Sequence, residues 1–199
     1  VGKCLYRYVK ENGSFDYARY REVQIKGNLA KITGDSIQEE AIAFLAIYLK
    51  QKKTEFQFGL CQGTRRGKEQ EYFIKYLKCE VLGTEISPTA SEFPHTVQWD
   101  SHEVKPEWRG KADFIYSNAF VDSYDQEKCL DSWMSSLKDN GICIIVHRSG
   151  SVSVSELDPF GTHLVFMPYL ITTCGKGKYS LREIIQSPFP VGKYSFFDN

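Results

Sequence analysis

The sequence predicts an α/β fold in which a mostly parallel β-sheet is covered on both faces by helices. Short apolar segments, typical of buried strands, alternate with longer segments in which apolar residues recur at helical spacing. Residues 142–146 are almost wholly apolar, as expected of a central parallel strand. The 199 residues are enough for one domain with a substantial core.

Residues 1–54 are expected to form an extension and a first helix that precede the sheet. Residues 19–32 alternate loosely between apolar and polar around a turn at Gly27-Asn28, which favours short strands or irregular structure. Apolar residues then recur at helical spacing behind a polar N-cap, so we expect a helix over 35–53.

The remaining residues, 55–199, are expected to form the core of a single structural domain. In order, the predicted strands are residues 56–61, 79–84, 95–99, 113–117 and 142–146. The predicted helices of the core follow Gly67, lie near 126–138 and span about 162–173. Two strands near 178–186 and 191–197 are expected to close the chain.

Composition narrows the classes of partner. Lys plus Arg and Asp plus Glu both number 25, so the formal net charge is zero, which disfavours a protein that relies on general attraction to nucleic-acid phosphates. No apolar run approaches the roughly 20 residues of a membrane span. We therefore expect neither a membrane nor a nucleic acid as partner, and the sequence leaves the oligomeric state open.

The six cysteines indicate a reducing compartment, which we take to be the cytoplasm. They form no CxxC pair, and most lie in apolar runs, where a reduced cysteine behaves as a small hydrophobic residue. With four histidines in the chain, no metal-binding pattern emerges, and we expect no metal.

Candidate ligand-binding residues follow the predicted strands at the edge of the sheet where ligands bind in such folds. Gly63 and Gly67 follow the first strand and precede a helix, whose N-terminus favours anionic groups. Glu85 ends the second strand, 18 residues beyond Gly67, a spacing that suits an acid accepting hydrogen bonds from a ribose. Asp100 ends the third strand, where it is placed to bind the amino group of a base, with Trp99 as an apolar wall.

Four segments together resemble the motifs of class I methyltransferases, which use S-adenosylmethionine (SAM). The resemblance covers about residues 55–199, although the first motif lacks its usual starting acid and Gly59 lies in that neighbourhood. In order, the segments are residues 58–67 (FGLCQGTRRG), 81–87 (VLGTEIS), 98–100 (QWD) and 113–120 (DFIYSNAF).

The resemblance implies a three-layer Rossmann-like methyltransferase fold that ends in a C-terminal antiparallel hairpin, with SAM as the cofactor. Carried over onto the matching positions, the implied cofactor-binding residues are Gly59, Cys61, Gly63, Thr64, Arg65, Gly67, Glu85, Ile86, Trp99, Asp100, Ser117 and Asn118.

Residues that follow the fourth and fifth strands are candidates for contacts with the methyl acceptor. Asp122 and His147 lie at the same predicted edge and are candidate general bases. Phe120 and Tyr124 are candidates for shaping the acceptor pocket. For each of these, the alternative is a structural role without contact to a substrate.

The most consistent function is transfer of a methyl group from SAM to a small-molecule or sugar-like acceptor by direct displacement. Two alternatives stay open. A nicotinamide-dependent oxidoreductase shares the glycine turn and the ribose acid, although the GxGxxG pattern is absent. A non-catalytic binding module could retain the same fold, because fold does not establish activity.

Overall fold

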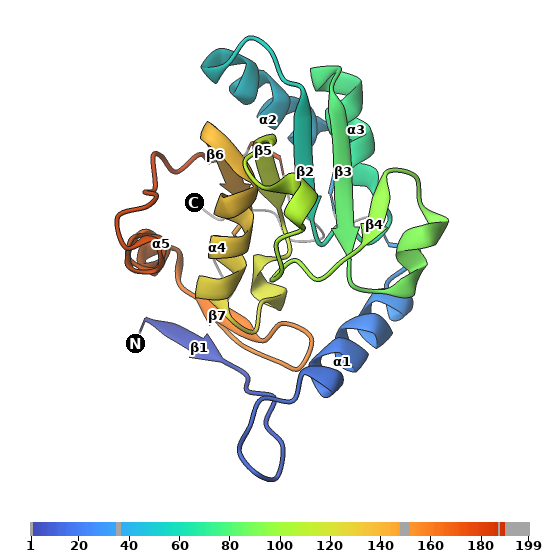
Figure 1. Cartoon of the computed structure of the whole chain (residues 1–199), viewed down its shortest axis with the longest axis vertical. Helices are drawn as coiled ribbons and strands as arrows, with labels where there is room; N and C mark the ends of the chain where they lie inside the picture. Colours follow the sequence, from blue (N-terminus) through green and yellow to red (C-terminus); the bar gives the residue numbers. More distant parts are fainter. Residues whose placement is uncertain (1, 35–36, 148–151, 187, 190–199) are drawn as a thin grey trace.

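The computed structural model describes residues 2–34, 37–147, 152–186 and 188–189 (Figure 1). Five strands form a parallel sheet in the order β4-β3-β2-β5-β6, which confirms the predicted α/β class. The strands are β2 (Phe58–Gln62), β3 (Glu80–Glu85), β4 (Thr96–Gln98), β5 (Ala112–Ser117) and β6 (Leu137–Ile145). The order reverses between β2 and β5, and such a switch point is where open α/β sheets bind ligands.

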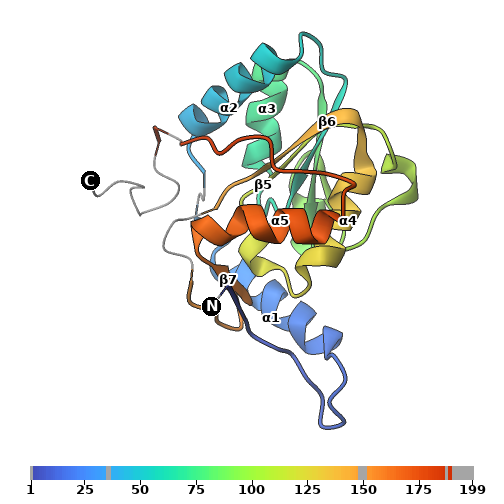
Figure 2. The same cartoon turned by 90° about the vertical axis from the view of Figure 1, so that its left-hand side faces the viewer.

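Helices cover both faces of this sheet, as Figures 1 and 2 show. They are α2 (Glu39–Lys52) and α3 (Lys68–Leu77) on one face, and α4 (Gln126–Ser136) and α5 (Met167–Gly175) on the other. Successive side chains of β2 point to opposite faces of the sheet and so pack in different layers of the core. Cys61 packs with α2 and α3, whereas Leu60 packs with α4 and α5.

The segment expected as strands or irregular structure, residues 19–32, is instead mostly helical. It lies in α1 (Tyr17–Ala30), which begins where the Asp16 carboxylate accepts a hydrogen bond from the backbone N–H of Arg19. Gly27 does not end the helix. A Cβ atom there would lie 2.2 Å from Cδ2 of Leu157, so this glycine allows α1 to pack closely against the loop around Leu157.

Several boundaries near the end of the sheet also differ from expectation. The helix α4 ends at Ser136, and β6 starts at once with Leu137 instead of at residue 142. The helix expected over 162–173 is the short 3₁₀ helix η4 (Leu164–Phe166) followed by α5.

The expected C-terminal hairpin is not present in the described part of the chain. Residues 178–186 have no regular secondary structure, and 191–197 lie outside the described residues. The antiparallel pair that the structure contains is formed by β1 (Lys3–Leu5) and β7 (Phe160–Thr162), which brings the N-terminal extension against the loop that follows β6.

A buried carboxylate joins the entry of β2 to the start of β5. Asp113 accepts hydrogen bonds from the backbone N–H groups of Gln57 (2.7 Å) and Phe58 (3.0 Å), and from the ammonium groups of Lys53 (2.5 Å) and Lys138 (3.1 Å). Burial opposes ionisation, but these bonds outweigh it and hold the pKa of Asp113 well below its usual range.

Asp113→Asn is expected to lower the free energy of unfolding by about 1–2 kcal/mol at pH 7. Because the folded-state pKa is depressed, the stabilisation is complete above the unfolded value of about 3.9 and is lost as pH falls through the folded value. Urea unfolding at pH 7, 5 and 3 checks this, with the exposed Asp139→Asn as the control. If the difference in free energy of unfolding between the unaltered chain and Asp113→Asn did not become smaller below about pH 4, the lowered pKa of Asp113 would be contradicted.

Candidate functional site

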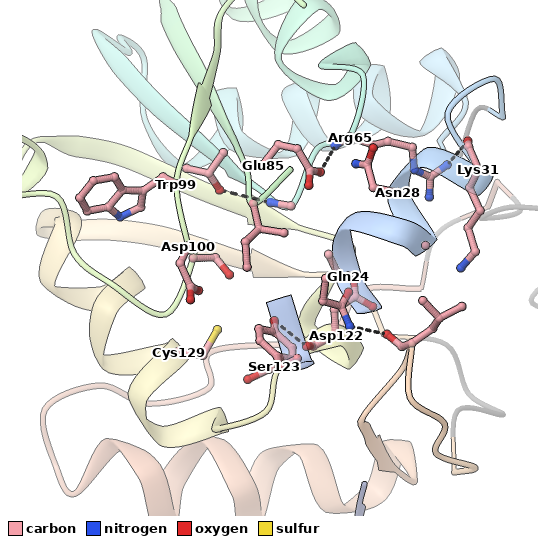
Figure 3. Close-up of a pocket in the computed structure, with 18 residues that line it drawn as sticks. Gln24, Asn28, Lys31, Arg65, Glu85, Trp99, Asp100, Asp122, Ser123 and Cys129 are labelled. Atoms are coloured by element: carbon pink, nitrogen blue, oxygen red, sulfur yellow. Dashed lines mark hydrogen bonds between the residues drawn. The ribbon is translucent and has the colours of Figure 1, made fainter. Parts of the chain in front are cut away.

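A cavity of about 90 Å³ lies at the carboxyl ends of β2, β3 and β5, against α1 (Figure 3). Seven of the residues predicted from sequence line it: Gly63, Arg65, Glu85, Ile86, Trp99, Asp100 and Asp122. The parallel strands bring these residues together because their carboxyl ends share one edge of the sheet.

The turn between β2 and α3 requires left-handed backbone at three positions. Gly63 and Gly67 have φ angles of 72° and 75°, which glycine adopts without steric cost. Arg65 has a φ of 45°, which is unusual for a residue with a side chain. In this conformation its backbone N–H donates to Oε2 of Glu85 at 3.1 Å, so the turn is tied to the end of β3.

Glu85 is held by hydrogen bonds from three residues of the cavity region. Its Oε1 accepts from the backbone N–H of Ser87 at 2.9 Å, and the side chain of Asn28 also bonds to the carboxylate. Burial raises the pKa of Glu85, whereas the hydrogen bonds from Ser87, Arg65 and Asn28 oppose that rise. An acceptor-only group of this kind suits a ligand that carries hydroxyl donors.

Asp100 lies across the cavity from Glu85 (Figure 3). Its Oδ2 accepts from the Tyr17 hydroxyl at 2.8 Å, and its Oδ1 faces His102. Burial would raise the pKa of Asp100, but the hydrogen bonds from His102 and Tyr17 outweigh burial, and the pKa is lowered. Asp100 is therefore an ionised acceptor at neutral pH.

Helix α1 contributes one wall of the cavity, which sequence reasoning missed. Its lining residues are Tyr20, Gln24, Gly27 and Asn28, with Lys31 directly after the helix. The Arg65 guanidinium fixes the end of this helix by donating to the backbone carbonyls of Lys31 and Gly34, both at 3.1 Å. The available signal was the spacing of Tyr20 and Gly27 by two helical turns.

Asp122 lies in η3 (Phe120–Asp122), on the opposite side of the cavity from β3. Its carboxylate accepts no hydrogen bond from any residue that the structure describes. Burial and the nearby carboxylates of Asp158 and Glu85 raise the pKa of Asp122 to about 8, against the smaller opposing effect of Lys31 and Arg65. A mostly buried carboxylate with such a pKa is able to take up or release a proton near neutral pH.

The other predicted cofactor residues lie outside the cavity lining. Gly59 and Cys61 face the core, and burial raises the pKa of the Cys61 thiol well above its usual value. Thr64 and Gly67 pack around the Gln70 amide, which donates to Oγ1 of Thr64 at 3.3 Å. The remaining two are Ser117, which donates to the Gln62 carbonyl at 3.0 Å, and Asn118, which donates to Glu69 at 3.3 Å. None of these six residues lines the cavity, and in the structure they pack in the core or bond to neighbouring segments.

Neither Phe120 nor His147 is placed to contact a ligand in this cavity. Phe120 is 1% exposed and packs in the core against Trp133 and Phe160. The His147 ring bonds to the Thr162 carbonyl (3.0 Å) and lines a different groove beside β6, so the prediction of His147 as a base is not supported. Tyr124 also lies outside the lining and stacks on His102.

Comparison with solved structures identifies the fold. The chain is similar to the 1,6-didemethyltoxoflavin-N1-methyltransferase of Burkholderia thailandensis, with a TM-score of 0.59 and 14% identity, over 81% of this chain and 80% of that one. It is also similar to the plantazolicin methyltransferase BpumL, with a TM-score of 0.59 and 15% identity, over 80% and 75% of the two chains.

A third similar structure is phosphoethanolamine N-methyltransferase 2 of Haemonchus contortus, with a TM-score of 0.58 and 14% identity, over 81% of this chain and 45% of that one. The chain has the class I methyltransferase fold. No family model matches the sequence, and no curated protein matches it either.

In this methyltransferase fold, the ends of the adjacent strands β3 and β4 supply two hydrogen-bond acceptors, Glu85 and Asp100, and η3 supplies a third acid that is able to bind a proton. Within the described ranges, no group of three or more His, Cys, Asp or Glu side chains could hold a metal ion. In the same residues, no helix has the length and apolar character needed to cross a membrane.

Proposed function

We propose that this chain is a SAM-dependent methyltransferase that acts on a small-molecule acceptor. The observation that carries the proposal is the convergence of the Glu85 and Asp100 carboxylates on one cavity at the switch point of a class I methyltransferase fold. Solved structures that share the fold, including the toxoflavin and plantazolicin enzymes, hold S-adenosylhomocysteine, the product of SAM.

The residues present fit this cofactor. Glu85 would accept hydrogen bonds from the two ribose hydroxyls, and Asp100 would accept one from the adenine amino group. Ile86 and Cys129 supply apolar surface to the same cavity. When bound, SAM supplies an electrophilic methyl group on a sulfonium ion.

Cofactor binding requires α1 to shift. The cavity of about 90 Å³ is smaller than the roughly 300 Å³ of a typical site for a ligand of that size. Two side chains at either end of α1, Tyr17 and Asn28, already bond to Asp100 and Glu85. We infer that these bonds are exchanged or shared when the cofactor enters, and that α1 then excludes water from the reacting groups.

Asp122 is the residue best placed to accept a proton from the methyl acceptor. Asp122 shares the cavity lining with Gly63 and Ala119, and its carboxylate is free of hydrogen bonds from the described residues. A cation nearby favours the ionised carboxylate, so a sulfonium or ammonium group in the cavity would lower the pKa of Asp122 and convert it into a base. Two of the similar structures hold small acceptors, 1,6-didemethyltoxoflavin and phosphomonomethylethanolamine, which supports an acceptor of this size.

Calorimetric titration with S-adenosylhomocysteine, with NADH and NADPH in parallel, tests the proposal. Binding of S-adenosylhomocysteine alone, in the micromolar range, is the expected result. Binding of a nicotinamide alone would replace the proposal with an oxidoreductase, and binding of none of the three would favour a non-catalytic module.

Glu85→Ala is expected to weaken the binding of S-adenosylhomocysteine by about 1–3 kcal/mol, because the ribose hydroxyls lose their buried partner. The same titration measures this loss, and thermal unfolding without ligand shows whether the variant is folded. Glu80→Ala, an exposed acid at the other end of β3, is the matched control. Unchanged affinity in the Glu85 variant would remove Glu85 from the site.

A further inference from the structure

His102 joins two segments of the cavity wall through both nitrogens of its ring. Its Nδ1 lies 2.8 Å from Oδ1 of Asp100, and its Nε2 lies 2.9 Å from Oγ of Ser123. The backbone N–H of His102 also donates to Oδ1 of Asp100, at 2.9 Å. The side chain is buried, and both of its partners line the cavity whereas the ring itself does not.

These contacts fix the tautomer of the ring. An ionised carboxylate only accepts hydrogen bonds, so Nδ1 carries the proton that is donated to Asp100. In the neutral ring Nε2 is then an acceptor, and the Ser123 hydroxyl donates to it. The chain of bonds therefore runs in one direction, from Ser123 through His102 to Asp100.

Aromatic side chains hold the ring in this orientation. The Tyr124 ring stacks on His102 with 3.9 Å between centroids and 22° between planes. The Tyr20 ring meets it edge to face at 6.0 Å and 89°. Rotation of the imidazole would break both hydrogen bonds and open this packing, so the Asp100 carboxylate has one defined orientation.

The consequence lies at the oxygen of Asp100 that faces α1. Oδ1 receives two hydrogen bonds from His102, whereas Oδ2 receives one, from the Tyr17 hydroxyl. Each carboxylate oxygen has two acceptor positions, which leaves Oδ2 able to accept a further N–H donor. A fixed carboxylate attracts an amino group at that point and repels a carbonyl oxygen.

We propose that His102 is a positioning residue that makes the nucleoside site selective for a purine with a 6-amino group over one with a 6-oxo group. This inference rests on the proposed function, since it assumes that Asp100 faces the base of the cofactor. Ser123 bonds to the ring and Tyr124 stacks on it, and neither needs to touch the base.

A pair of variants separates the two bonds of the ring. His102→Asn places an amide where Nδ1 was and retains the bond to Asp100, whereas His102→Gln places its amide near the position of Nε2 and retains the bond to Ser123. For each variant and for the unaltered chain, calorimetry gives the affinity for S-adenosylhomocysteine and for S-inosylhomocysteine, its 6-oxo analogue.

The unaltered chain is expected to prefer S-adenosylhomocysteine by about 100-fold. His102→Asn should keep this preference within about threefold, and His102→Gln should reduce it at least tenfold. Equal preference in the two variants would overturn the inference. So would an unaltered chain that binds both ligands equally well. Failure of the unaltered chain to bind either ligand would instead overturn the proposed function.

Two further measurements apply if His102→Gln does not fold. Ser123→Ala removes the other bond of the ring and should leave the preference unchanged, so a loss of preference in that variant would overturn the inference. Nitrogen NMR of the unaltered chain should find the Nδ1–H tautomer of His102. A ring protonated at Nε2 alone would also overturn the inference, because its Nδ1 could not donate to Asp100.

Discussion

Asp122→Asn is expected to raise the free energy of unfolding at pH 9 by about 2–4 kcal/mol, although it removes a charged residue. In the folded chain Asp122 keeps its proton up to a pKa of about 8, whereas an unfolded aspartate releases its proton near 4. Between these values the folded state holds one more proton than the unfolded state. The stability linked to Asp122 is therefore complete below about pH 4 and is lost as pH rises through about 8.

In the asparagine variant residue 122 does not titrate. The difference in free energy of unfolding between this variant and the unaltered chain should therefore grow from pH 5 to pH 9. Urea unfolding at four pH values measures it, and Asp139→Asn, an exposed acid, is the control. The groups that face Asp122 are Asp158, Glu85, Lys31 and Arg65, and they are the same in all three proteins. If the free energy of unfolding changed with pH in the same way for the unaltered chain and for Asp122→Asn, the Asp122 carboxylate would be ionised in the folded state.

The same variant should lose activity. For an acceptor that must give up a proton, removal of the base is expected to slow methyl transfer by about 10²–10⁴-fold, with affinity for S-adenosylhomocysteine within about threefold. A gain in stability with a loss of activity is typical of a residue kept for function at a cost to folding. Full activity with every acceptor would leave Asp122 without a catalytic role.

The sequence allowed the sheet to be predicted because its signals are local. Each strand is a short apolar segment bounded by polar or glycine turns, and each carboxylate at a strand end lies at one edge by the geometry of parallel strands. In this way Glu85, Asp100 and Asp122 were predicted to lie at one edge of the sheet, and in the structure all three line one cavity.

What the sequence did not predict depends on contacts between distant segments. Only Tyr20, Gly27 and Asn28 of α1 are buried, so the apolar periodicity of this helix is weak. Gly27 by itself indicates a turn, and its role becomes clear only from the packing of Leu157 against it. The bond between His102 and Ser123 joins residues 21 positions apart on different loops. No local pattern indicates such a pair.

Gly59 is one of the six predicted cofactor residues that lie outside the cavity lining, and the structure gives it a packing role. It pairs with Phe114 on the neighbouring strand β5, and a Cβ atom at Gly59 would lie 2.2 Å from Cε1 and 2.3 Å from Cζ of that ring. Phe114 is fully buried and packs on Phe73 with ring centroids 4.9 Å apart, so the ring has little room to move. Gly59 is therefore a packing glycine.

Gly59→Ala is expected to lower the free energy of unfolding by about 2–3 kcal/mol, because the added methyl group overfills the core at this strand pair. In urea unfolding, the double variant Gly59→Ala, Phe114→Leu should lose less stability than the sum of the two single variants, since the smaller side chain makes room for the methyl group. Additive losses of unfolding free energy would mean that the clash lies elsewhere.

The folded fraction of Gly59→Ala should still bind S-adenosylhomocysteine within about threefold of the unaltered chain, because the glycine lies outside the cavity. A large loss of affinity with no loss of stability would return Gly59 to the cofactor site that the sequence motif first indicated.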